Sequence, residues 1–148
     1  MPTTRRTREL NASQAAIWTI VGDPERRPAW WPNVSRVEEA TGEAWTDVLQ
    51  TERGKAVRAD FTLVSAEAPH QVTWRQEVAD SPFERLLALA ETEVVLEPSS
   101  GGTTVKITAV RKLRGWGLFG GGLVRRATGR QLVEALDALE DAVAPGSG

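Results

Sequence analysis

The sequence predicts a single domain of the α+β class, in which an antiparallel sheet of about seven strands precedes one long C-terminal helix. Between residues 45 and 108, apolar and polar residues alternate in several runs, a pattern typical of strands with one buried face. Hairpin-length turns separate these runs, which indicates antiparallel pairing. Beyond residue 120, apolar residues instead recur every three or four positions, as in a helix that packs along one face.

Two short helices are expected between a first strand and this β region. Residues 3–12 are largely polar but suit a strand. Ser13 is a favourable N-cap for the helix that follows, and the apolar face of this helix is formed by Ala16, Ile17 and Ile20. Asp23-Pro24-Glu25 begins a second helix, because it combines an N-cap, a proline at the first helical position and an acid near the positive end of the helix dipole.

The alternating pattern assigns the remaining strands. The runs that show it are residues 45–51, 57–63, 72–78, 92–96 and 104–108. The sequence Ser99-Ser100-Gly101-Gly102 joins the last two runs and predicts a hairpin. Residues 83–91 fit either a helix or a strand, and we assign them to a strand.

A single apolar stripe defines the C-terminal helix. Its members are Val124, Thr128, Leu132, Leu136, Leu139 and Val143, spaced three or four residues apart. The opposite face carries Arg126, Arg130, Glu134, Asp137 and Asp141. Gly129 lies inside this helix and predicts either a kink or a close contact with a neighbouring element. We expect the domain to cover residues 1–144, followed by a flexible tail at 145–148.

Three glycines before this helix, Gly115, Gly117 and Gly120, form the pattern G-x-G-x-x-G that is found in dinucleotide-binding proteins. A dinucleotide fold also requires a parallel strand after the helix, with an acidic residue at its end. Only 28 residues follow Gly120, and most of them belong to the helix. We therefore predict no dinucleotide cofactor and interpret the glycines as a flexible connection between the last strand and the helix.

Composition limits the chemistry that the protein can perform. Because it has no cysteine, no tyrosine and one histidine, disulfides, thiolate metal sites and histidine-based metal sites are excluded, and we expect no metal and no cofactor. No apolar run approaches the ~20 residues that span a bilayer, and no secretory signal is recognisable, so a cytoplasmic protein is expected. The net charge of −2 and the lack of a recognition motif argue against a nucleic-acid partner.

Several segments, taken in order, carry a resemblance to a known family. They are Leu10-Asn11-Ala12-Ser13, Ile17-Trp18, Asp23-Pro24, Trp30-Trp31-Pro32-Asn33-Val34, Trp74, the hairpin over residues 96–103 and residues 132–140. With the order of elements, they make the chain similar to the START-like, or Bet v 1-like (SRPBCC), superfamily, particularly its bacterial polyketide cyclase/dehydrase and lipid transport branch. This resemblance implies a helix-grip fold, in which a curved sheet surrounds the long helix and leaves a ligand cavity between them. The lack of tyrosine and of a cavity histidine departs from catalytic members.

Aromatic and apolar residues on the inner strand and helix faces are the candidates for lining such a cavity. They are Trp45, Phe61, Leu63, Trp74, Gln76, Val124, Thr128 and Leu132. Gln76 shares the strand face of Trp74 and is expected to orient a ligand. The alternative is that these residues only pack the core. No catalytic residue is assigned, because Glu77, Glu91 and Glu93 alternate with apolar neighbours and are expected on the outer face.

The candidates for the cavity entrance are aromatic: Trp31, Trp116 and Phe119. Trp31 is expected to be partly exposed, whereas its neighbour Trp30 is expected in the core. Trp116 and Phe119 lie among the glycines and either gate ligand entry or cover the end of the helix.

A basic segment flanks this loop. Residues 98–133 include seven basic residues and no acidic one. Arg114, Arg125 and Arg126 in this segment suggest a transient contact with an anionic membrane surface. The alternative is a solvated helix end.

Together, these observations favour a protein that binds or transports a small hydrophobic molecule, such as a lipid, isoprenoid or polyketide, in an internal cavity. One alternative is an aromatase/cyclase-type enzyme that positions a polyketide-like substrate, and a buried ionisable group in the cavity would favour it. Another is a module that docks a protein partner through its sheet or long helix, and a large exposed apolar patch would favour it. The sequence does not specify an oligomeric state.

Overall fold

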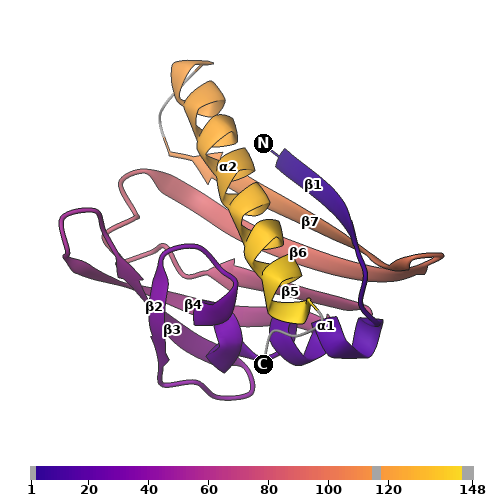
Figure 1. Cartoon of the computed structure of the whole chain (residues 1–148). Helices are drawn as coiled ribbons and strands as arrows, with labels where there is room; N and C mark the ends of the chain where they lie inside the picture. Colours follow the sequence, from indigo (N-terminus) through magenta and orange to yellow (C-terminus); the bar gives the residue numbers. More distant parts are fainter. Residues whose placement is uncertain (1–2, 115–117, 145–148) are drawn as a thin grey trace.

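Seven antiparallel strands form one curved sheet, in the order β1-β7-β6-β5-β4-β3-β2, and a long helix lies across one of its faces (Figure 1). This computed structural model describes residues 3–114 and 118–144, with only the backbone of residues 118–121. The strands are β1 (Thr3–Leu10), β2 (Val34–Glu38), β3 (Ala44–Gln50), β4 (Ala56–Glu67), β5 (Gln71–Gln76), β6 (Leu87–Ser99) and β7 (Gly102–Leu113). The helices are α1 (Gln14–Val21), the 3-10 helix η1 (Pro24–Ala29) and α2 (Leu118–Val143). The predicted α+β helix-grip fold is confirmed.

The two short helices begin where the capping residues predict. The Ser13 hydroxyl accepts a hydrogen bond from the backbone N–H of Ala16 at 3.1 Å. The Asp23 carboxylate accepts one from the N–H of Glu25 at 3.0 Å. Each cap satisfies a backbone donor that has no partner inside its own helix. The buried residues of α1 are Ile17, Ile20 and Val21, whereas Ala16 is exposed, so its predicted place on the buried face is wrong.

Two stretches of the sheet differ from the prediction. The edge strand β2 is not predicted by alternation, because a register shift between Val34 and Arg36 interrupts its pairing with β3. Residues 83–86 form a turn rather than a strand. Hydrogen bonds from the N–H groups of Leu86 and Leu87 to the carbonyl of Phe83, at 3.0 and 2.9 Å, close this turn. From Leu87 onward the strand assignment is correct, since β6 begins there.

Helix α2 packs its predicted apolar stripe against the sheet (Figure 1). Thr128, Leu132, Leu136 and Leu139 are buried, and Val124 and Val143 are half-buried near the two ends of the stripe. The helix continues through Gly129 without a break. A Cβ atom at this position would lie 2.5 Å from Nη2 of Arg6 in β1, so the glycine marks a close contact with that strand and not a kink.

The connection between β7 and α2 is shorter than predicted. Strand β7 ends at Leu113 and α2 begins at Leu118, so Gly120 belongs to the first turn of the helix. Gly115 and Gly117 lie outside the described residues. The strands pair antiparallel, as predicted, which contradicts the parallel unit that a dinucleotide site requires.

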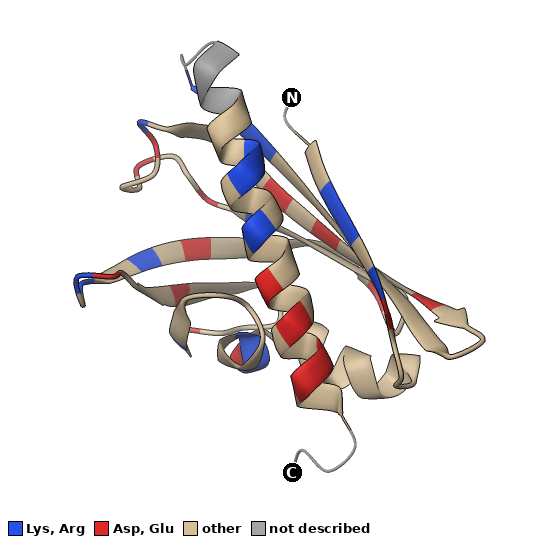
Figure 2. Ribbon diagram, turned by 45° about the horizontal axis from the view of Figure 1, so that its top comes forward, with Lys and Arg blue, Asp and Glu red and all other residues tan. Residues whose placement is uncertain are grey.

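The charges of α2 are divided along its length (Figure 2). The basic residues Arg125, Arg126 and Arg130 lie in the first half, and the acidic residues Glu134, Asp137, Glu140 and Asp141 lie in the second. Arg8 of β1 donates to the carboxylate of Asp137 at 2.5 Å and lies 3.5 Å from that of Glu140, which links the second half to the edge strand. Among the helices that the structure describes, none is long and apolar enough to cross a lipid bilayer.

Candidate functional site

A buried ion pair lies in the space between η1 and the sheet. Arg27 of η1 donates hydrogen bonds from Nε and Nη2 to the carboxylate of Asp47 in β3, at 2.8–3.0 Å. Both side chains are almost completely enclosed. The guanidinium carbon also lies 4.6–5.4 Å from the ring centroids of Trp31, Trp45, Phe61 and Trp74. One carboxylate and the surrounding rings therefore compensate the charge of Arg27.

Aromatic packing fixes the positions of these rings. Trp30, Trp31 and Trp74 meet edge to face, with centroids 5.2–6.2 Å apart. Trp45 stacks on Phe61 at 5.7 Å. Trp30 belongs to the core, as predicted. Trp31 is 5% exposed, so the prediction that it is partly exposed is wrong, and the physical reason is its contact with the two other tryptophan rings.

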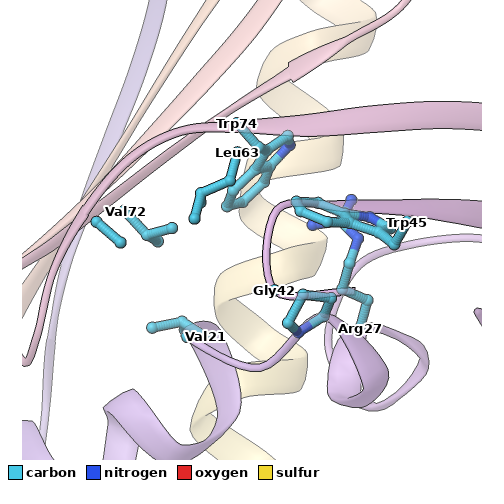
Figure 3. Close-up of a pocket in the computed structure, with 10 residues that line it drawn as sticks. Val21, Arg27, Gly42, Trp45, Leu63, Val72 and Trp74 are labelled. Carbon is cyan, nitrogen blue, oxygen red and sulfur yellow. The ribbon is translucent and has the colours of Figure 1, made fainter. Parts of the chain in front are cut away.

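Two small cavities of the described part of the chain adjoin the ion pair and the rings. The first lies between α1, η1 and the sheet and has a volume of about 50 Å³. Figure 3 shows Arg27 extending from η1 toward Trp45, with the side chains of Leu63 and Val72 projecting from the sheet. The main lining residues are Val21, Arg27, Trp45, Leu63, Val72 and Trp74. This volume is well below the ~150 Å³ that holds a benzene molecule in a protein interior.

The second cavity lies on the other side of the ion pair, toward α2, and has a volume of about 90 Å³. Its apolar lining consists of Trp31, Leu49, Phe61, Trp74 and Ala90. Its polar lining consists of Asp47, Gln76, Thr92, Arg111 and Gln131. Aromatic walls with a few polar groups at defined positions are typical of sites that bind small molecules. This second cavity is therefore the candidate functional site.

The register of the sheet explains why a space opens here. Phe61 of β4 pairs with Gln76 of β5. Because Arg75 pairs with Glu91, Gln76 comes level with Ala90 of β6. Ala90 in turn pairs with Arg111 of β7. Two long polar side chains thus flank one methyl group on the inner face of the sheet, and the small side chain of Ala90 leaves the cavity between them.

Gln76 brings an unpaired polar group to this cavity. Its side-chain Nε2 is buried and, within the described part of the chain, has no hydrogen-bond partner. A buried amide N–H without a partner is costly, because it has lost its hydrogen bonds to water. The position of Gln76 beside the cavity agrees with its predicted place on the same strand face as Trp74.

Arg111 brings a positive charge to the same cavity. Its Nη1 donates to the carbonyls of Glu91 and Val110 at 2.8 and 3.1 Å, and its Nη2 donates to the Thr92 hydroxyl at 3.1 Å. No carboxylate lies within ion-pair distance of it among the described residues. Burial lowers the pKa of Arg111 to about 10, because desolvation disfavours the charged form. The guanidinium is nevertheless charged at pH 7.

Sequence reasoning did not single out Arg111 as a site residue. A signal for it exists, since Val105, Ile107 and Ala109 are buried and alternate along β7, and Arg111 is the next residue on that face. A charge at an inward-facing position of a strand indicates a functional site or a buried ion pair. If Arg111 is considered only as one of the seven basic residues of its segment, it is expected to lie on the surface.

The second cavity reaches α2 at Gln131. Gln131 lines this cavity and also a surface groove of about 420 Å³. The other residues of the groove are Pro32, Asn33, Glu52, Ala127, Thr128, Arg130 and Glu134. Gln131 of α2 thus lies between the cavity and the groove.

The predicted cavity residues are distributed over several places. Trp45 and Leu63 line the first cavity, Phe61 and Gln76 the second, and Trp74 both. Thr128 lines the surface groove. Leu132 is fully buried in the core, and Val124 is half-buried; neither lines these three spaces. Glu77 is exposed, and Glu91 and Glu93 alternate with buried neighbours in β6, which agrees with the outer face predicted for them.

Of the three predicted entrance residues, only Trp31 has a side chain within the described part of the structure. Trp116 lies outside the described residues, and so does the side chain of Phe119. Trp31 lines both the second cavity and a further surface hollow, so it separates inside from outside. Arg114, Arg125 and Arg126 are exposed. Over residues 3–114 and 118–144, no cluster of three or more histidine, cysteine or acidic residues could hold a metal ion.

A curved antiparallel sheet around a long C-terminal helix, with a small aromatic-lined cavity between them, defines a helix-grip protein. The chain belongs to the family described as polyketide cyclase / dehydrase and lipid transport, which matches it over residues 1–144. No curated protein matches it in sequence.

Solved structures share this fold at low sequence identity. The di-domain ARO/CYC StfQ from the steffimycin biosynthetic pathway superposes with a TM-score of 0.77 at 14% identity, covering 96% of this chain and 50% of that protein. The chain thus spans half the length of StfQ. A START superfamily protein from Mycobacterium smegmatis gives 0.76 at 17% identity, covering 95% of this chain and 96% of that one. A protein from Thermus thermophilus gives 0.74 at 21% identity, covering 99% and 100%.

Proposed function

We propose that the protein binds a small, mainly hydrophobic molecule in the second cavity, between the sheet and α2. The observation that carries this proposal is the buried, unpaired amide of Gln76 at the edge of an aromatic-lined cavity. Aromatic walls supply apolar burial, and a bound molecule would supply the hydrogen-bond partner that Gln76 lacks. The family, whose description includes lipid transport, supports the same class of function.

The size of the cavity limits how such a molecule binds. A volume of about 90 Å³ is smaller than the ~300 Å³ of most ligand pockets. A ligand therefore places one end in the cavity and continues past Gln131 into the surface groove. Apolar burial against Trp31, Phe61 and Trp74 then holds the inner end.

Binding can be tested without knowing the natural ligand. Native mass spectrometry of the purified protein should show a co-purified molecule, and the neutral probe N-phenyl-1-naphthylamine should bind with a rise in its fluorescence. Ala90→Leu should reduce probe binding about tenfold, because it fills the space between Gln76 and Arg111. The matched control is Ala56→Leu, which adds the same volume at an exposed position of β4. Equal loss in both variants would contradict the proposed site.

A second candidate function is supported by one observation, the charged Arg111 in the cavity lining. A partly buried guanidinium can stabilise negative charge that develops on a substrate oxygen, as a cyclisation or dehydration of a polyketide-like chain requires. Asp47 is not free to act as a base here, because Arg27 engages both of its carboxylate oxygens. Incubation with a linear poly-β-ketone and mass detection of water loss tests this candidate, and a rate unchanged in Arg111→Met would exclude it.

A further inference from the structure

We propose that the second cavity selects ligands with a carboxylate group, which Arg111 and Gln76 bind from the two sides of Ala90. The ligand class is a small amphipathic carboxylic acid, with the carboxylate inside the cavity and a ring or short apolar chain toward Gln131. This inference rests on the proposed function and names the ligand class of the same site.

Gln76 and Arg111 both offer unpaired hydrogen-bond donors at this site. Gln76 presents its unpaired amide Nε2. Of the five N–H groups of Arg111, three have acceptors among the described residues, which leaves two for a ligand. The ligand group that matches these donors must carry acceptor oxygens, and a carboxylate offers two of them without a proton.

The charge balance of the cavity lining also calls for one negative charge. Arg27 and Asp47 form an ion pair and so neutralise each other. The acid nearest in register to Arg111 is Glu91, but its carboxylate binds Arg75 at 3.1 Å on the outer face. The charge of Arg111 therefore has no acidic partner within the described residues, and a monoanionic ligand neutralises it. A guanidinium is the side chain that binds carboxylates best, because it offers parallel N–H groups.

The spacing of the two side chains suits a single small group. Gln76 and Arg111 lie on β5 and β7 with one strand between them, so their backbones are about 10 Å apart, which is two strand spacings. Both side chains line the same cavity, and Ala90 lies between them in the register of the sheet. One carboxylate between them can receive hydrogen bonds from both, while Phe61 and Trp74 cover the carbon atoms next to it.

The test compares acids with neutral compounds of the same shape. ω-Phenyl carboxylic acids, from phenylacetate to 5-phenylpentanoate, and the corresponding primary alcohols are titrated at pH 7 by calorimetry. The wild-type protein should bind the best acid at least about tenfold more tightly than its alcohol, the effect of one charge-assisted hydrogen-bonded pair. Arg111→Met should remove this preference and leave the affinity for the alcohol within about twofold. Gln76→Leu should weaken acid binding about threefold to tenfold.

Two further variants separate the possible failures. Arg114→Met removes an exposed cation outside the cavity and should leave every affinity unchanged. Arg111→Lys keeps the charge but loses the paired N–H groups, so it should bind acids with an affinity between those of wild type and Arg111→Met. If acids and alcohols bind equally well to wild type, and Ala90→Leu still weakens their binding, the carboxylate proposal is overturned while the proposed function stands. If no compound binds in a way that Ala90→Leu weakens, both proposals are overturned.

Discussion

Arg27 and Asp47 join the 3-10 helix η1 to strand β3 through hydrogen bonds of 2.8–3.0 Å between the guanidinium and both carboxylate oxygens. The side chains are 3% and 0% exposed. Four aromatic rings enclose the guanidinium. A charge pair in such surroundings is stable only while both members are present, because each would otherwise be an isolated buried ion.

Asp47→Ala should therefore lower the free energy of unfolding by about 3–5 kcal/mol, since it leaves the Arg27 guanidinium buried without a counter-charge. Urea unfolding followed by tryptophan fluorescence measures this loss. The double variant Arg27→Met/Asp47→Leu removes both charges and should recover most of it. A loss below about 1 kcal/mol in Asp47→Ala would mean that water reaches the pair and that the enclosure is incomplete.

The hairpin between β6 and β7 depends on a glycine that no other residue can replace. Gly102 has φ of +143°, and a Cβ atom there would overlap the carbonyl oxygen of Leu10. Gly102→Ala should lower the free energy of unfolding by at least about 2 kcal/mol, from backbone strain and the displacement of β1. Gly42→Ala is the control, because a Cβ atom at Gly42 meets nothing within 4 Å. Equal stability of the two variants would show that the hairpin adapts.

Most of the fold could be predicted from the sequence, because the determining signals are local. Ser13 and Asp23 cap their helices through their own side chains. The stripe of α2 and the alternation in β4 to β7 follow from the repeat of each element. Strand β2 was not predicted, because its pairing with β3 contains a register shift. Residues 83–86 form a turn because the Phe83 carbonyl accepts local hydrogen bonds that alternation does not reveal.

The candidate site could be predicted only in part. Phe61, Trp74 and Gln76 lie on strands whose inner faces are readable from alternation, and they do line the second cavity. Gln76 and Arg111 lie at the same cavity because of the register of three strands, which is a non-local property. The pairing of Arg27 with Asp47 likewise joins residues 20 positions apart. Because such a pair requires the complete fold, no pattern within either segment indicates it.

A stabilising change is expected in the long helix. Gly129→Ala should raise the free energy of unfolding by about 0.5–1 kcal/mol, because glycine is a poor residue for a helix interior. The new methyl group would meet Nη2 of Arg6, which is the end of an exposed, flexible side chain and can move aside. Thermal unfolding measures the gain, and Gly122→Ala, where a Cβ meets nothing within 4 Å, provides the reference for open space. A loss of stability at Gly129 alone would mean that β1 holds Arg6 in place.

Arg111 should reduce the stability of the ligand-free protein, as expected of a group retained for binding. Burial lowers its pKa to about 10, so the charged form is destabilised in the folded chain relative to the unfolded chain. Arg111→Met should raise the free energy of unfolding by about 1–3 kcal/mol at pH 7. Arg114→Met, at an exposed position, should change it by less than about 0.5 kcal/mol.

The pH dependence of this difference identifies its cause. Well below a pH of about 10, Arg111 is protonated in both the folded and the unfolded chain. The gain in unfolding free energy from Arg111→Met should therefore be constant between about pH 6 and about pH 9. Above a pH of about 10 the folded wild type releases the proton while the unfolded chain keeps it, so wild-type stability rises relative to the variant and the gain shrinks. Urea unfolding of both proteins at about pH 7, about pH 8.5 and about pH 10.5 measures this difference in unfolding free energy. A gain that does not shrink at pH of about 10.5 would show that side-chain packing, and not the desolvated charge, causes the difference.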